Sequence, residues 1–450
     1  MSDNPSDEAL FGTGAETPSE QLGPASSPSP GFQPDPSDAL RLAVGQVMEI
    51  QDVTLGEPRT PLRFRGRLVT SASEAFRTLR PPFERLGYTP QLRREEGLDV
   101  VRALPGVFGR AERRTPWLNI ILLIATILSV FYVGFQQELY IPIAEAVIVQ
   151  ITGDTTLASN PALLPTPAEF REALFTGALY ALALLGILGA HEMGHYLMAR
   201  RHGVHTTLPF FIPLPFNILG TLGAVIAMRE PAPNRRIQFD IGIAGPLAGL
   251  IVAVPVMAVG LMLSQVGTPA DFVQQMPEAA RDSVVFFQEG QSLLYLAIKF
   301  LVFGRLLPSG DLDVWIHPVA FAAWAGFLVT ALNLLPIGQL DGGHVMFGLF
   351  GEKVRRLRWP VIGVLVILAA AGSLNDAGLM NLPFGWSGWW LWVMMAVLLL
   401  RNHAPVLDEI TELDSTRKAL GVMMLVIFVL IFTPRPIVIS GSAVTLLLGG

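Results

Sequence analysis

ALFTGALYALALLGILGAHEMGHYLM, residues 173–198, is an apolar stretch long enough to cross a membrane as a helix. It contains the pattern His191-Glu192-Met193-Gly194-His195. On a helix this spacing puts the two imidazoles on one face with the Glu192 carboxylate beside them, which is the layout of a zinc hydrolase site. Ionisable side chains are costly at membrane depth, so their presence here indicates a function.

The composition of the 450-residue chain is typical of a protein that crosses a membrane several times. Hydrophobic residues make up 51% and charged residues 15%, whereas soluble domains are about a quarter charged. The net charge of -6 and the lack of a Lys/Arg tract argue against a nucleic acid partner. The chain has no cysteine, which excludes disulfides and Cys-ligated metal.

The N-terminal part of the chain precedes the apolar stretches. Residues 1–39 are rich in Ser, Pro, Gly and acidic residues, so we expect a disordered tail, and they show no signal peptide. Residues 40–110 have a globular composition and predict a small soluble α/β domain. We expect a strand at 62–69, and a helix at Ser73–Leu86 that the pair Pro81-Pro82 breaks or kinks.

The rest of the chain predicts an all-α polytopic membrane domain at residues 115–434, followed by a C-terminal apolar segment at 435–450. About seven spans are expected: Trp117–Phe135, Ala173–Met198, Phe239–Ser264, Pro318–Leu335, Pro360–Gly372, Trp386–Leu400 and Leu420–Phe432. Leu208–Met228 is apolar but interrupted by prolines and glycines, which does not suit a membrane helix. Ser292–Phe303 and Ile437–Leu448 are short, and their composition does not decide whether they cross.

Basic residues set the expected orientation, because they favour the cytoplasmic side of a membrane. Arg110, Arg113 and Arg114 precede the first span, so the N-terminus is predicted to be cytoplasmic. Following the spans, most other basic residues fall on the same side: Arg200, Arg201, Arg229, Arg235, Arg236, Lys353 to Arg358, Arg401, Arg417 and Lys418. We therefore expect a multi-pass protein of the cell membrane, with the active-site end of the second span also cytoplasmic.

A catalytic zinc usually has three protein ligands, and the best candidate for the third is Asp341. It lies in NLLPIGQLDGGH, residues 333–344, just past an apolar helix that Pro336 and the glycines would unwind. Unwound backbone at membrane depth is tolerated only where it lines a protein cavity. One Zn²⁺ with two neutral imidazoles, one carboxylate and one hydroxide is formally neutral, which lowers the cost of such a site in a membrane.

The depth of the two motifs supports this pairing. His191 lies about 18 residues beyond Ala173 and Asp341 about 23 beyond Pro318, so both would approach the cytoplasmic end of their spans. This requires that Ser292–Phe303 does not cross the membrane, because a crossing there would put Asp341 on the opposite side. The sequence therefore predicts that Ser292–Phe303 is interfacial or re-entrant.

The motifs at 191–195, 333–336 and 340–342 together resemble those of the site-2 protease family of intramembrane zinc metalloproteases. The stretches TLPFFIPLP (207–215), PNRR (233–236) and GPLAG (245–249) are similar to the branch that contains the plant chloroplast proteins named for ethylene-dependent gravitropism deficiency and yellow-green leaves, with its bacterial relatives. The resemblance covers about Leu174 to Gly343 well. The inserted PDZ-like stretch of bacterial envelope-stress relatives is not found, which is a departure from the part of those relatives that sizes substrates.

By this resemblance, His191, His195 and Asp341 would bind one zinc and Glu192 would be the general base. Asn333 would lie at the active site and hold the substrate carbonyl or oxyanion. The protein would be a zinc metalloendopeptidase that hydrolyses peptide bonds in or near transmembrane segments of membrane proteins, in regulated intramembrane proteolysis. Residues 115–434 would be its metalloprotease domain, and Leu208–Met228 a membrane-associated β-hairpin beside the site.

Several alternatives remain open at this point. Asn333 is also suited to a helix-end cap. His344 is suited to a turn, to supporting Asp341 or to binding the metal in competition with it. The glycines of 245–249 fit close helix packing better than a catalytic role. The competing functions are a membrane zinc protease of the prenyl-protein-processing type, whose third ligand would be a Glu, and an inactive zinc-binding scaffold, which would more readily have lost Glu192.

Overall fold

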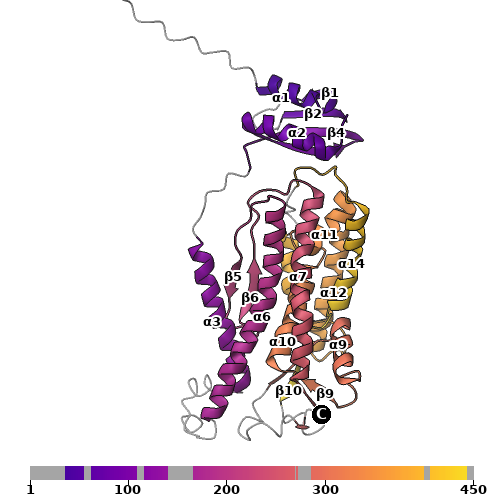
Figure 1. The fold of residues 1–450 in the computed structure, drawn as a ribbon. Helices are drawn as coiled ribbons and strands as arrows, with labels where there is room; N and C mark the ends of the chain where they lie inside the picture. The colour runs from indigo at the N-terminus through magenta and orange to yellow at the C-terminus, as the bar shows by residue number, and fades with distance from the viewer. Residues whose placement is uncertain are drawn as a thin grey trace, which may run out of the picture.

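The computed structural model describes residues 36–54, 62–108, 116–139, 166–268, 270–271, 285–399 and 406–442. Within these residues, an N-terminal α/β unit lies at one end of a bundle of long helices (Figure 1). Short strands lie beside the bundle and at its opposite end. The predicted disordered tail falls almost entirely on residues 1–35, which are outside the described residues.

The N-terminal unit is a four-stranded antiparallel sheet with two helices. Its elements are α1 (Pro36–Gly45), β1 (Met48–Thr54), β2 (Leu62–Leu68), α2 (Ala72–Arg85), β3 (Tyr88–Glu95) and β4 (Leu98–Pro105). The strand order is β1-β2-β4-β3. Apolar side chains of the helices and strands form one core, with Leu40, Phe64, Leu79 and Phe83 fully buried. The helix α1 begins at Pro36, so residues 36–39 are not part of a tail.

Two details of this unit differ from the sequence-based expectation. The helix α2 continues through Pro81 and Pro82, and its N-cap is Ser71. Its buried face, which includes Leu79 and Phe83 on either side of the prolines, packs into the core and offsets the lost backbone hydrogen bonds. Residues 92–104, where the sequence allowed a strand and a short helix, lie in the hairpin of β3 and β4 and contain no helix.

The bundle is built from helices of very different lengths. They are α3 (Trp117–Leu139), α6 (Pro167–Arg201), α7 (Arg235–Met262), α9 (Leu293–Phe303), α10 (Pro318–Asn333), α11 (Asp341–Phe350), the 3₁₀ helix η3 (Gly351–Leu357), α12 (Arg358–Asp376), α13 (Trp389–Leu399) and α14 (Ser415–Ile431). The helices α6, α7 and α10 pack against one another around a shared core. Together with the start of α11, they surround the predicted metal ligands.

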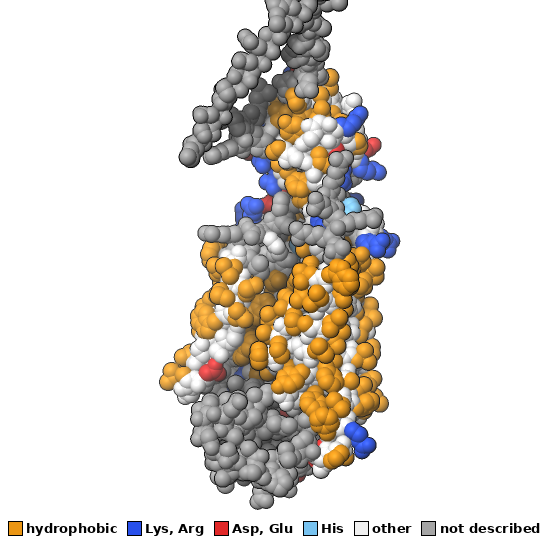
Figure 2. Space-filling view, turned by 90° about the vertical axis from the view of Figure 1, so that its left-hand side faces the viewer, with side chains coloured by type: hydrophobic (Ala, Val, Ile, Leu, Met, Phe, Trp, Pro, Cys, Tyr) orange, Lys and Arg blue, Asp and Glu red, His pale blue; other side chains and the backbone are white. Residues whose placement is uncertain are grey.

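Four helical stretches are long and apolar enough to cross a membrane. These are Trp117–Glu138, Pro167–Arg201, Arg235–Met262 and the continuous stretch Asp341–Asp376. The face shown in Figure 2 carries an almost unbroken apolar surface over the bundle, as lipid contact requires. The expected membrane protein is therefore supported, while crossings by α10, α13 and α14 remain a prediction, because these helices are shorter.

The helix α9 does not bridge the two ends of the bundle. Its 11 residues span about 16 Å, half of the ~30 Å hydrocarbon core. It is preceded by β8 (Val285–Glu289) and followed by β9 (Asp313–Trp315). The Gln288 side chain of β8 donates a 2.7 Å hydrogen bond to Asp313 of β9, so the chain leaves α9 where it entered. This agrees with the requirement that residues 292–303 do not cross.

Lys299 is fully buried on α9. Its Nζ lies 3.4 Å from Glu289 Oε1 and 3.5 Å from Asp313 Oδ1, and it also contacts the Tyr295 ring. Two carboxylates thus compensate the buried ammonium group. This ion cluster joins α9 to the strands at its two ends.

Two further strand pairs flank the bundle. The strands β5 (Phe210–Pro213) and β6 (Thr221–Val225) form the expected hairpin, which lies between α3 and α6 (Figure 1). β10 (Ile437–Ser442) pairs with β8, so the described part of the predicted C-terminal apolar segment is a strand and not a span. β7 (Gln265–Gly267) pairs with β9 at the same end of the bundle.

The segment 406–413 connects the N-terminal unit to the bundle. The Leu92 N–H of β3 donates a 2.7 Å hydrogen bond to the Leu407 carbonyl, and the Leu407 side chain completes the core of the N-terminal unit. The Leu407 N–H donates in turn to the carbonyl of Ala232, just before α7, at 3.0 Å. The N-terminal unit is therefore attached at the end of the bundle where α6 ends and α7 begins.

Candidate metal centre

The helix α6 carries the first two candidate ligands without interruption. Thr166 and Glu169 form a capping box at its start, and the helix then continues for 35 residues to Arg201. His191 and His195 lie one turn apart on its buried face, with exposed fractions of 3% and 6%. Their ring centroids are 4.9 Å apart, as the sequence spacing on a helix requires.

Asp341 reaches the same place from the other side of the core. The helix α10 ends at Asn333, the chain turns through residues 334–340, and Asp341 is the first residue of α11. A Cβ on Gly342 would lie 1.9 Å from the Leu334 carbonyl oxygen, so the turn closes only over a glycine. The start of a helix favours a carboxylate, because the helix dipole is positive there.

The three side chains converge on one point. Asp341 Oδ2 lies 3.2 Å from His191 Nε2 and 3.2 Å from His195 Nε2, and all three ligand atoms are within 4.8 Å of one another. Ligands about 2.0–2.1 Å from a tetrahedral zinc are about 3.3 Å apart. The two separations from Asp341 Oδ2 to the imidazole nitrogens therefore match those of ligands that share a zinc. His344 is not in this group.

A backbone carbonyl orients His195. Its Nδ1 lies 2.7 Å from the carbonyl oxygen of Ile241 on α7 and donates a hydrogen bond to it. The proton is thereby held on Nδ1, which leaves the Nε2 lone pair directed at Asp341 and free to bind a metal. The sequence did not predict this contact, because a carbonyl acceptor is present at every residue.

Glycines on α7 make room for both imidazoles. A Cβ on Gly245 would lie 2.1 Å from His195 Nε2, and one on Gly249 would lie 3.3 Å from the His191 ring. On α6, a Cβ on Gly194 would lie 2.4 Å from the Ala244 carbonyl oxygen. The expected close helix packing at 245–249 is present, and it also shapes the space around the ligands.

Glu192 lies beside the ligands and next to the hairpin. Its side chain is buried, with an exposed fraction of 5%, and interacts electrostatically with His195 and Asp341. The backbone N–H of Ile226, just after β6, donates a hydrogen bond to its carboxylate. The candidate base is thus held between the metal ligands and the end of a strand.

Asn333 lies at the centre as well. Its Nδ2 is 3.3 Å from His191 Nε2, on the same side as Asp341. The position of Asn333 as the last residue of α10 explains how the turn brings both residues to the histidines. The sequence placed Asn333 near the site only through the family resemblance, and the geometry agrees.

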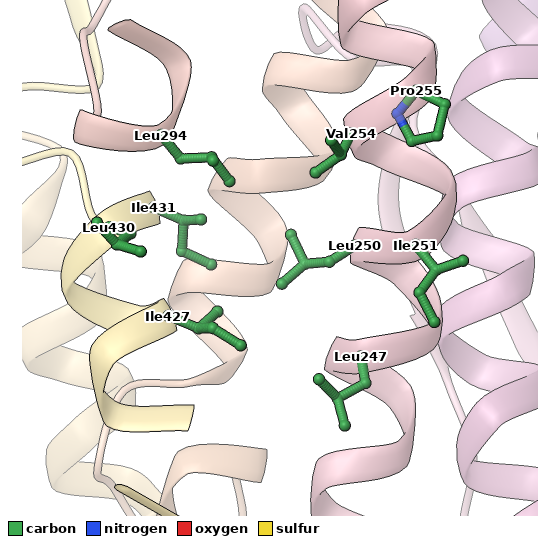
Figure 3. A pocket seen from close by; sticks show the side chains of 9 residues that line it. All are labelled: Leu247, Leu250, Ile251, Val254, Pro255, Leu294, Ile427, Leu430 and Ile431. Atoms are coloured by element: carbon green, nitrogen blue, oxygen red, sulfur yellow. The ribbon is translucent and has the colours of Figure 1, made fainter. Parts of the chain in front are cut away.

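A separate groove lies on the other side of α7. It is lined by nine apolar residues of α7, α9 and α14, has a volume of about 480 Å³, and contains no ionisable side chain (Figure 3). The groove includes Leu247 and Leu250, whereas Gly245 and Gly249 contact the histidines. Its lining can hold apolar groups but supplies no chemistry.

Residues 179–371 match the sequence model of peptidase family M50. The chain is 34% identical over 257 residues to the probable chloroplastic zinc metalloprotease EGY1 of Arabidopsis thaliana, covering 56% of this chain and 42% of that protein. It is 31% identical over 276 residues to the probable chloroplastic zinc metalloprotease EGY2 of Oryza sativa subsp. indica, covering 61% and 46%. The chain thus spans less than half the length of these relatives.

The match and the geometry meet at the same residues. The matched region includes all of His191, Glu192, His195, Asn333 and Asp341. The names of the relatives specify zinc, and the ligand separations fit zinc. The resemblance noted from the motifs is confirmed, and the chain contains a domain of peptidase family M50, the site-2 protease family.

Proposed function

We propose that this protein is an intramembrane zinc metalloendopeptidase that cuts other membrane proteins in or near their transmembrane segments, in regulated intramembrane proteolysis. The observation that carries the proposal is the convergence of His191, His195 and Asp341 within apolar helices, with separations of 3.2 Å and Glu192 beside them. An inactive scaffold would more readily have lost the buried carboxylate of Glu192.

Each polar side chain has a role in this reaction. Zinc, when bound by the two histidines and Asp341, would supply a Lewis acid that lowers the pKa of a water molecule to about 7. Glu192 accepts a proton on its carboxylate from the attacking water and returns it to the leaving amine. The Asn333 amide, 3.3 Å from His191 Nε2, is positioned to donate to the substrate carbonyl oxygen.

The hairpin supports a way of holding the substrate. A transmembrane helix hides its carbonyls in backbone hydrogen bonds, so cleavage requires an extended segment. Residues 224–226 lie at the end of β6, next to Glu192, and an extended peptide added to this edge would pass the base and the metal. We infer that the hairpin holds the unwound substrate there.

The distribution of charge supports a membrane orientation. Basic side chains gather mainly at the end of the bundle nearer the N-terminal unit (Figure 2). The elements at this end include Arg200, Arg201, Arg235, Arg236 and Arg417. Since basic residues favour the cytoplasmic side, we propose a cell-membrane protein with the N-terminal unit and the nearer end of the site in the cytoplasm.

The test is to compare membrane proteomes of cells with the wild-type protein and with Glu192→Gln. This change is nearly isosteric and keeps the histidines and Asp341, but it removes the proton acceptor, so cleavage should fall by about 10²–10⁴-fold. Membrane-spanning substrates should accumulate in the variant, and their cleaved fragments should disappear. A matched Glu352→Gln variant, altered in an exposed ion pair of η3, should behave as wild type.

The outcome also separates the competing functions. Identical proteomes for wild type and Glu192→Gln would contradict the protease and favour a zinc-binding scaffold. Accumulation only of proteins with prenylated C-termini would favour the prenyl-processing type. The expected result is accumulation of proteins that share a transmembrane segment and no lipid modification.

A further inference from the structure

A cluster of charged side chains ties the ends of three helices together close to the metal ligands. Asp240 lies on α7 and directly precedes Ile241, whose carbonyl accepts the hydrogen bond from His195. Arg417 of α14 donates two hydrogen bonds to the Asp240 carboxylate, from Nε at 2.8 Å and from Nη2 at 2.7 Å. His202, directly after α6, approaches the same carboxylate with Nε2 at 3.0 Å.

The cluster is well built for holding helices in place. The paired hydrogen bonds between a guanidinium and a carboxylate fix distance and direction together. The side chains of Asp240, Arg417 and His202 are 13%, 28% and 23% exposed, so solvent screens the cluster less than it screens a surface ion pair. Arg417 also bonds to Asp414, the N-cap residue of α14, which orders the guanidinium from its other side.

The need for such a cluster follows from how α6 meets α7. At the metal ligands, the contact is made by Gly194, Gly245 and Gly249, which have no side chains to interlock. Small residues allow close approach but do little to fix the sliding or rotation of one helix on the other. The Ile241 carbonyl must nevertheless stay 2.7 Å from His195 Nδ1. The glycine contact leaves this register to the rest of the packing between α6 and α7, to which the ion cluster adds paired, directional hydrogen bonds.

We propose that Asp240 and Arg417 are positioning residues for the metal centre, acting through the Ile241 carbonyl on His195. With His202, they lock the start of α7 to the end of α6 and to α14, so that the carbonyl meets the imidazole. The proposal rests on the proposed zinc site, and it assigns a role in that site to α14, which lies beyond the matched family region.

The experiment uses the full-length protein in detergent, with Zn²⁺ affinity measured by competition against a chelator. Asp240→Asn and Arg417→Gln should each lower the zinc affinity by about 10–100-fold, as loss of support for a metal ligand does. The double variant should be no weaker than either single one, because both act through one contact. Arg417→Lys keeps the charge without the paired geometry and should recover part of the affinity.

Two measurements separate positioning from general stability. The absorption spectrum of bound Co²⁺ should change in the variants at a temperature where all are folded, since it reports ligand geometry. Arg355 forms an exposed ion pair with Glu352, with Nε 2.8 Å from Oε2. The control variant Arg355→Gln should change neither the zinc affinity nor the Co²⁺ spectrum. If Asp240→Asn does not fold, the two Arg417 variants decide, because they leave Asp240 in contact with His202.

Different results would contradict the proposed function and the proposed positioning role. A wild-type protein that binds no zinc would contradict the proposed function itself. A wild-type protein that binds zinc, with folded variants of equal affinity and an unchanged Co²⁺ spectrum, would overturn the positioning role and leave the function standing.

Discussion

Gly245 lies where the His195 ring meets α7, and a methyl group there would sit 2.1 Å from the Nε2 that we propose as a metal ligand. His191 and His195 therefore depend on a neighbouring helix that offers space at this point and a carbonyl one turn earlier, at Ile241. At the scale of single residues, the metal centre consists of its ligands together with the backbone that orients them.

We expect Gly245→Ala to lower the zinc affinity by about tenfold or more, because His195 must turn away from both the metal and its carbonyl acceptor. Equilibrium competition for zinc measures this. Gly186→Ala is the matched control, since Gly186 lies on α6, and a Cβ there would meet nothing within 4 Å. Equal zinc affinity in the two variants would show that the ring does not need the space.

The sequence predicted the residues that carry recognisable chemistry. His191, Glu192, His195 and Asp341 were proposed from side-chain type, spacing and depth, and the structure brings them together. Ile241 was not, because it contributes only a carbonyl. The pairing of Asp240 with Arg417 also escaped prediction, because two charges far apart in the sequence give no sign that they will meet.

The hairpin of β5 and β6 is the element whose role is most open to test, because it ends at the amide that donates to Glu192. The hairpin lies between α3 and α6, beside the metal ligands.

Prolines and glycines correctly predicted a break in helical structure at this hairpin. In α2, by contrast, two prolines did not end the helix, because a buried face held it together. Local signals are reliable only where tertiary packing agrees with them.

We expect proline at Ala224, Val225 or Ile226, placed singly, to abolish cleavage while zinc stays bound. Neighbouring N–H groups of a strand point to opposite edges, so proline removes an N–H open to the substrate at Ala224, one that faces β5 at Val225, and the one that donates to Glu192 at Ile226. Ser, Thr and Val at the same three positions are the matched controls, since they keep the N–H. Cleavage at the wild-type rate by all three proline variants would exclude substrate addition at this edge.

The whole molecule combines an apolar bundle with a soluble unit at one end. The segment 406–413 joins the two, and basic side chains gather mainly at that end. The number of crossings could not be derived from the sequence alone, since short apolar stretches such as 293–303 fit either a span or a re-entrant helix. The burial of Lys299 between two carboxylates depends on tertiary contacts, which a hydropathy pattern does not predict.

The proposed topology predicts which residues face which compartment. The chain has no cysteine, so single cysteines can be labelled with a membrane-impermeant maleimide in intact cells. Cysteines that replace Asp271 and Asp311, on either side of α9, should both be labelled from outside. Cysteines that replace Arg355 and Lys418 should be labelled only after the membrane is opened. Labelling of Asp271 and Asp311 from opposite sides would mean that α9 crosses the membrane, contrary to the proposed topology.

The most direct measurement compares zinc content and cleavage for the purified wild type, Glu192→Gln and Asp341→Ala in lipid vesicles, with a membrane-spanning substrate. We predict about one zinc per chain in the wild type and in Glu192→Gln, cleavage by the wild type alone, and loss of both zinc and cleavage in Asp341→Ala. Chelation should abolish wild-type cleavage, and added zinc should restore it. Undiminished cleavage by Glu192→Gln, or full zinc content in Asp341→Ala, would contradict the proposed metal centre.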